Sequence, residues 1–128
     1  MTEVLSAPAE RFDLPLVRKH PQLLPAGLRL ECGSGWGSLL DDLFQSIQAH
    51  VEASQADQPT VARVKEKFGS LRVGIRSSDP VIADLVSETC ARSAITCEIC
   101  GGAGAGVLEG GWQRTRCTKH RDTPAPWL

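Results

Sequence analysis

This sequence of 128 residues is poor in aromatic side chains and contains no long apolar run. Tyrosine is absent, and Trp and Phe occur three times each. With so few rings to stack on bases, a net charge of −1 and a pI near 6.3, the composition argues against a protein that mainly coats nucleic acid. No apolar run approaches the ~20 residues of a spanning helix, so we expect no membrane segment.

Marks of secretion and of catalysis are missing as well. The first residues, MTEVLSAPAERFD, have neither a basic beginning nor a continuous apolar stretch, so we expect a cytoplasmic protein. No G-x-S-x-G element, phosphate-binding loop or paired-carboxylate pattern occurs in the sequence. We therefore predict that the protein is not an enzyme.

Charge is divided unevenly along the chain. Residues 1–60 contain four basic and eight acidic residues, whereas residues 61–128 contain ten basic and seven acidic ones. Such an asymmetry can orient an approaching partner, although two ordinary solvated faces would produce it too.

The cysteines point to a metal site rather than to disulfides. Their number, five, is odd, and four of them lie after residue 89. The last three form a C-x2-C-x16-C-x2-H pattern in which each pair of ligands can bind one ion from a single tight turn. Thiolates and imidazole suit zinc, and four protein ligands leave no open coordination position. We predict one structural zinc ion bound by Cys97, Cys100, Cys117 and His120.

Other interpretations of this pattern are weaker. A redox pair at Cys97 and Cys100 calls for a thioredoxin-like βαβ context, which does not precede it. A catalytic deaminase zinc site calls for H-x-E, which is absent, and for proline where Thr96 stands. Buried, inert cysteines leave the paired spacing unexplained. Glu98, between two ligands, is expected to be solvated.

Apolar periodicity predicts two helices and two hairpins. One helix begins near Trp36, and residues 60–76 predict a hairpin that turns at Gly69-Ser70. Asp79-Pro80 marks the start of the second helix, and residues 107–109 and 112–116 flank Gly110-Gly111 in a second hairpin. The buried stripe of the first helix is expected to be Leu39, Leu40, Leu43, Phe44, Ile47 and Val51.

The predicted fold is α+β, with antiparallel β-hairpins, two packed helices and a C-terminal zinc-ribbon-like element. We expect a single domain over residues 1–128. Its parts are an irregular proline-rich arm (1–29), an α+β body (30–94), a zinc-binding element (95–121) and a tail (122–128). Because prolines interrupt helices, the arm should be extended with short helical turns, and its Leu and Val residues should pack on the body.

Four segments carry a resemblance to a known group of proteins. They are GWGSLLDDLFQSI, VARVKEKFGSLRVGI, TCEICGGAG and GGWQRTRCTKH. Together they resemble a group of small, uncharacterised bacterial and prophage-associated proteins with a VKEKFG-x-LR hairpin and a C-terminal CxxCG…GGWxRTxCxxH zinc site. The likeness covers roughly residues 30–121. It implies the same four metal ligands and no catalytic activity.

The leading hypothesis for function is a non-enzymatic protein-interaction module, specifically an immunity protein that binds and neutralises a bacterial toxin domain. The surplus of acid in residues 1–60 suits a toxin with a basic cleft. We expect the partner to dock on Trp36, Asp41, Asp42 and Glu52. Trp36 is either an exposed interface anchor or a core residue.

The alternative hypothesis is a zinc-ribbon nucleic-acid-binding or regulatory protein of prophage origin. Basic residues on both hairpins favour it, although the same alternation occurs on any half-exposed sheet. These residues are Arg63, Lys65, Lys67, Arg72, Arg76, Arg114, Arg116, Lys119 and Arg121.

Overall fold

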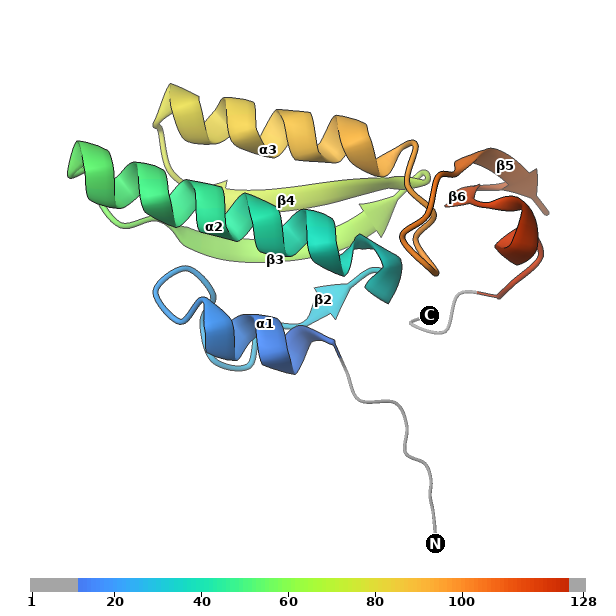
Figure 1. Ribbon diagram of the computed structural model, residues 1–128, viewed down its shortest axis with the longest axis horizontal. Coiled ribbons are helices and arrows are strands. Elements are labelled where there is room, and N and C mark those ends of the chain that lie inside the picture. Colours follow the sequence, from blue (N-terminus) through green and yellow to red (C-terminus); the bar gives the residue numbers. More distant parts are fainter. Residues whose placement is uncertain (1–11, 125–128) are drawn as a thin grey trace, which may run out of the picture.

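A computed structural model describes residues 12–124 and shows an α+β architecture (Figure 1). Within that range no helix is long and apolar enough to cross a membrane. The helices are α1 (Asp13–Lys19), α2 (Gly37–Ser54) and α3 (Pro80–Ser93), with 3-10 turns η1 (Ser34–Trp36) and η2 (Thr118–His120). The strands are β2 (Leu30–Glu31), β3 (Thr60–Lys67), β4 (Ser70–Arg76), β5 (Ala105–Glu109) and β6 (Trp112–Arg116).

The larger sheet has the strand order β2-β3-β4 and is mixed, which corrects the expectation of purely antiparallel pairing. β3 and β4 form the predicted hairpin, whereas β2 runs parallel to β3, with Leu30 opposite Val64. Parallel neighbours need a crossover connection, and α2 supplies it between β2 and β3. A strand of two residues shows no alternation, so periodicity could not reveal it.

The hairpin turn is formed by Phe68 and Gly69, one residue earlier than predicted. Both residues have positive φ, 55° and 80°. Two-residue loops of this type require the left-handed conformation at both positions, which glycine adopts freely and phenylalanine does not. The prediction placed Gly69 first in the turn, whereas it is second.

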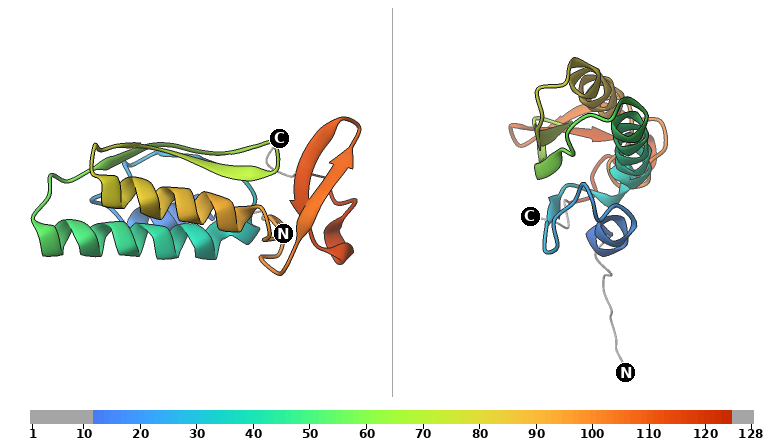
Figure 2. Two further views of the ribbon diagram at one scale, coloured as in Figure 1. Left: turned by 90° about the horizontal axis from the view of Figure 1, so that it is seen from above. Right: turned by 90° about the vertical axis from the view of Figure 1, so that its left-hand side faces the viewer.

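The core lies between the larger sheet and a layer formed by α2 and α3, which lie side by side on one of its faces (Figure 2). The predicted start of α3 is confirmed, because the Asp79 side chain accepts a hydrogen bond from the Val81 N–H at 2.9 Å. The predicted apolar stripe of α2 is also confirmed. Its buried members are Leu39, Leu40, Leu43, Phe44, Ile47 and Val51.

Residues 12–124 contain three α-helices rather than the predicted two, and the additional one, α1, lies in the proline-rich segment. Residues 1–11 of the expected arm lie outside the described residues. Pro15 is in the first turn of α1, where its missing N–H breaks no helical hydrogen bond. Leu16, Leu23 and Leu24 are buried in the core, so residues 12–29 pack on the body.

Asp41 connects α1 to α2. Its carboxylate accepts a hydrogen bond from Lys19 Nζ at 2.8 Å and lies 2.7 Å from His20 Nε2. These two partners hold the pKa of Asp41 below its ordinary value. Asp41, which we expected to face a partner, is therefore engaged within the chain.

Asp41 should make the stability of the fold depend on pH. Because its pKa is lower in the folded state, its contribution is present above the unfolded-state pKa of about 3.9 and is lost as the pH falls through the folded-state value. The stability advantage of the natural chain over Asp41→Asn should therefore be constant above about pH 5 and shrink below about pH 4. Urea unfolding from pH 2 to 7 measures it. Parallel curves for the natural chain and Asp41→Asn would contradict the prediction.

Candidate metal centre

The first ligand pair, Cys97 and Cys100, occupies a tight turn after α3. The Cys97 N–H donates to the Gly102 carbonyl and the Gly101 N–H donates to the Cys97 carbonyl, both at 2.8 Å. Gly101 has a φ of 82°, a left-handed conformation that a side chain disfavours. The glycine after the second cysteine thus allows the chain to bend beneath the ligands, as expected.

In the second ligand pair, Cys117 is the N-cap of η2 and His120 is its last residue, and the His120 N–H donates to the Cys117 carbonyl at 3.2 Å. The hairpin that carries it is confirmed, since β5 and β6 pair antiparallel around Gly110-Gly111. This hairpin returns the chain to the first turn, where the Glu98 N–H donates to the Thr115 carbonyl at 3.2 Å.

The four ligand atoms of Cys97, Cys100, Cys117 and His120 lie within 4.8 Å of one another and can hold one metal ion. The sulfurs of Cys100 and Cys117 are 3.8 Å apart. His120 Nδ1 lies 3.8 Å from the sulfur of Cys97 and 3.2 Å from that of Cys117. A tetrahedral zinc ion with bonds of about 2.3 Å to sulfur and about 2.05 Å to nitrogen separates its ligands by roughly 3.6–3.8 Å. The two distances of 3.8 Å match this spacing, and the four donors as a group are close enough to hold one metal ion.

The backbone favours the thiolate form of Cys97. Burial opposes its ionisation, but hydrogen bonding from the backbone at Cys100, Cys117 and Ile99 outweighs burial and lowers the pKa of Cys97 to about 6. Because metal ligands must be deprotonated, a thiolate at neutral pH suits a metal-binding role.

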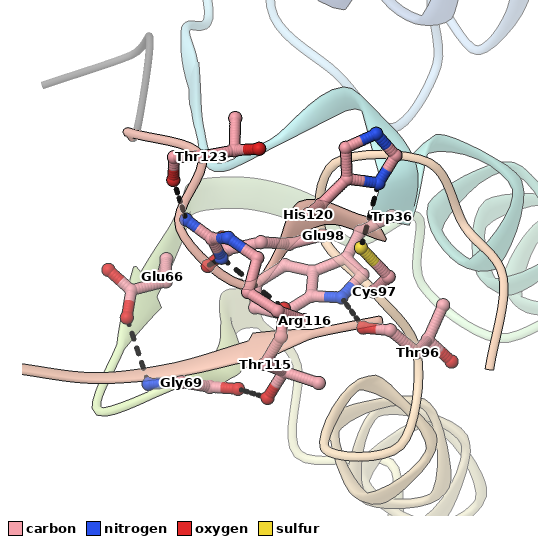
Figure 3. Close-up of polar contacts among 10 residues, drawn as sticks. All are labelled: Trp36, Glu66, Gly69, Thr96, Cys97, Glu98, Thr115, Arg116, His120 and Thr123. Carbon is pink, nitrogen blue, oxygen red and sulfur yellow. Dashed lines mark hydrogen bonds and ion pairs between the residues drawn. The ribbon is translucent and has the colours of Figure 1, made fainter. Parts of the chain in front are cut away.

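A buried ion pair joins the two ligand turns directly (Figure 3). Glu98 follows Cys97, Arg116 precedes Cys117, and Arg116 Nη1 lies 2.5 Å from Glu98 Oε1 with both side chains fully buried. Burial raises the pKa of Glu98, and Arg116 opposes that shift. The expectation that Glu98 is solvated is wrong, because the return of β6 places a cation over it.

Residues before α2 attach the first ligand turn to the body. The indole N–H of Trp36 donates to the Thr96 carbonyl at 2.9 Å (Figure 3). The Gly35 N–H donates to the Glu98 carbonyl at 2.9 Å, and a Cβ at Gly35 would overlap the Cys97 backbone. Trp36 is 0% exposed, so the alternative of an exposed interface anchor is wrong and the core alternative holds.

The turn of the first hairpin contacts β6. The Thr115 hydroxyl donates to the Gly69 carbonyl at 2.5 Å, and the Gly69 N–H donates to Glu66 Oε2 at 2.9 Å (Figure 3). A Cβ at Gly69 would lie only 3.2–3.3 Å from the Arg114 backbone. The metal-binding element is thus joined to the far end of the β3–β4 hairpin as well as to α2.

The remaining predicted site residues do not form one surface with Trp36. Asp42 and Glu52 are exposed on α2, where Glu52 accepts a hydrogen bond from Gln48 at 3.2 Å. Asp41 contacts α1 instead. Cys32, outside the metal cluster, is buried in the core, where desolvation raises the pKa of its thiol.

The sequence interpretation missed the Glu98–Arg116 pair, although its signal is present in the chain. Each member is directly adjacent to a predicted ligand, and their charges are opposite. Two ligand turns that meet at one ion bring such neighbours together.

Comparisons with protein-family models, with curated proteins and with solved structures found no match to this chain.

Purified protein should contain one zinc ion per chain. Because binding brings two separated turns together, Cys100→Ser and Cys117→Ser should each lose the ion and the order of residues 95–121. Elemental analysis and NMR measure both effects, and Cys90→Ser, at a thiol outside the cluster, should retain the ion. Protein without zinc, or with a disulfide between Cys97 and Cys100, would contradict this prediction.

Glu98→Ala should destabilise the metal-loaded protein by about 3–5 kcal/mol, because it leaves the Arg116 charge buried without its carboxylate. Adding Arg116→Met should restore much of the loss, since two apolar side chains replace the pair without an uncompensated charge. Urea unfolding at constant free zinc measures both variants. A cost below about 1 kcal/mol for the single change would show that water or another group compensates Arg116.

Proposed function

We propose that this chain is a zinc-stabilised protein-interaction module without catalytic activity. The observation that carries the proposal is the closed Cys97, Cys100, Cys117 and His120 group, whose spacing fits a tetrahedral ion. Four protein ligands fill that geometry and leave no position for water or substrate, as in structural zinc sites. A water or substrate atom bound directly to the ion would contradict a purely structural role.

The proposed metal is zinc, and the proposed element is a zinc-ribbon-like hairpin. Three thiolates and one imidazole form a set of ligands that zinc prefers. Each ligand pair comes from its own tight turn, and the β5–β6 hairpin connects the two turns. This supports a role for the ion in holding the hairpin against the body rather than in chemistry.

The negative charge on the outer surface of α2 and α3 favours a basic protein as the partner. Its exposed acids are Asp42 and Glu52 on α2 and Asp84 and Glu88 on α3, against the single exposed cation Arg92 of these two helices. We call these four acids the acidic helix layer. Acidic surfaces accelerate encounter with basic partners through electrostatic steering.

We further propose that the partner is a bacterial toxin domain and that this protein is its immunity protein. Toxins that act on nucleic acids or nucleotides have basic clefts, because their substrates are anions. The acidic helix layer complements such a cleft, and the resemblance to prophage-associated proteins favours the same role. Asp42 and Glu52 remain the proposed contacts of the four residues first expected, since Trp36 is buried and Asp41 binds α1.

The proposal predicts that the immobilised, zinc-loaded protein captures a basic protein from lysate of its native organism. That protein should arrest growth when expressed alone and be harmless when co-expressed with this chain. Asp42→Lys with Glu52→Lys should slow association about tenfold at low salt, because steering charges are reversed. Stopped-flow or surface-based kinetics measure the change.

The matched control is Asp57→Lys with Asp122→Lys, which makes the same charge change at exposed acids outside the two helices. These variants should associate at nearly the natural rate. A captured protein that does not affect growth rejects the immunity role. Equal slowing by both double variants rejects docking on the acidic helix layer.

A further inference from the structure

The helices α2 and α3 leave one face of the larger sheet uncovered (Figure 2). This face carries a row of cations. Strand alternation directs the apolar side chains of β3 and β4 toward the helices and the basic ones outward. We call this outward surface the basic sheet face. It consists of Arg63, Lys65 and Lys67 of β3 and Arg72 and Arg76 of β4.

The charge of this face is not balanced within the sheet. Lys65 is directly opposite Arg72, and like charges in this arrangement destabilise a strand pair. Glu31 of β2 is the acidic residue in register with Lys65. Within residues 12–124, none of the five cations takes part in an ion pair. The face thus retains a positive field that an anionic ligand would relieve.

The basic sheet face continues into a groove where the two hairpins meet. The groove has a volume of about 890 Å³ and lies between Phe68 of the first hairpin and Gly111 and Trp112 of the second. Its charged lining residues are three cations and two acids: Arg29, Lys65, Lys67, Glu31 and Glu66. Phe68 is 66% exposed and Trp112 is 67% exposed. Two open rings beside a positive surface are the combination with which proteins bind single strands, phosphates on cations and bases on rings.

The conformation of Phe68 supports a role in binding rather than in folding. Its φ of 55° is strained for a bulky side chain at a position where Asn or Gly is ordinary. Lys67 Nζ lies 5.5 Å from the centre of the Phe68 ring, and Arg114 Cζ lies 5.9 Å from the centre of the Trp112 ring. A strained, exposed ring beside a cation indicates a functional constraint on this turn.

We propose that the basic sheet face and its groove bind single-stranded nucleic acid. Alternate residues of a strand are about 6.7 Å apart, so Arg63, Lys65 and Lys67 present a regular row of charge to an extended phosphate backbone. Phe68 and Trp112 stack on bases at the end of this row. A duplex fits this surface less well, because its paired bases are not free to stack on the two rings. The site lies on the opposite side of the sheet from the acidic helix layer and does not depend on the proposed protein partner.

Fluorescence anisotropy of the full, zinc-loaded chain with labelled oligo-dT and oligo-rU of about 12 nucleotides tests the proposal. Binding should weaken steeply with salt. Lys65→Glu with Arg72→Glu should abolish most binding at about 50 mM salt and reduce the slope of log K against log salt by roughly 1.4, which corresponds to two phosphate contacts. Arg18→Glu with Arg92→Glu makes the same charge change elsewhere and should bind nearly as the natural chain does.

The rings are tested separately from the charges. Phe68→Asn should raise the melting temperature, because Asn tolerates a positive φ, and yet weaken binding by at least about fivefold through the lost stacking. Trp112→Ala should weaken binding by a similar factor. A variant that binds less because it folds less would show the opposite shift in melting temperature.

Four outcomes overturn the proposal. One is no detectable binding of either oligonucleotide at about 50 mM salt. A second is tighter binding of a duplex of equal length. A third is equal loss of binding in the two charge-reversed double variants. The fourth is displacement of the oligonucleotide by a poly-glutamate peptide of equal charge with no effect of Phe68→Asn, which would assign the face to an acidic protein segment instead.

Discussion

The meeting of two turns that carry Cys97, Cys100, Cys117 and His120, one on either side of a hairpin, is the constraint on which this structure depends. The first turn is attached to the start of α2 through Gly35 and Trp36, and the hairpin is attached to the β3–β4 turn through Thr115. Closing the four ligands therefore joins three parts of the chain at one end of the core. The Glu98–Arg116 pair makes the same junction within a fully buried space.

This arrangement leaves two surfaces of opposite charge on either side of the sheet. Both follow from one fact of topology, that the two long helices cover the same face of the sheet (Figure 2). The helices present Asp42, Glu52, Asp84 and Glu88 to solvent, and the uncovered face of the sheet presents five cations of β3 and β4 against the one acid Glu31 of β2. The net charge of the chain is thus near zero although its positive and negative charges lie on separate surfaces.

The sequence could predict the features that depend on the spacing of a few neighbouring residues, but not those that depend on contacts between distant segments. The metal ligands, the buried stripe of α2, the start of α3 and both hairpins follow from spacing over a few residues, and the structure places them as expected. The burial of Trp36, the parallel pairing of β2 and the pairing of Glu98 with Arg116 depend on contacts between distant segments. The residues next to Trp36 and Glu98 in the sequence do not indicate whether these two side chains are buried or exposed. Turns of this type are predicted from residues that favour a positive φ. Phe68 has a positive φ although phenylalanine disfavours it, so its position in the turn was not predicted.

The hydrogen bond from Trp36 to Thr96 spans sixty positions of the chain, and that from Thr115 to Gly69 spans forty-six. During synthesis at about 5–20 residues per second, α2 and the first hairpin leave the ribosome seconds before the residues that complete their end of the core. Until Thr96 emerges, the indole of Trp36 has no carbonyl to bind, and until Cys117 and His120 emerge, the first ligand turn holds only half of the four donors. Contacts of such long range also slow folding, because loop closure must precede the contacts that stabilise it. This end of the core therefore stays incomplete until the last residues of the metal-binding element have been synthesised, which is the latest point in the chain at which any part of the core can close.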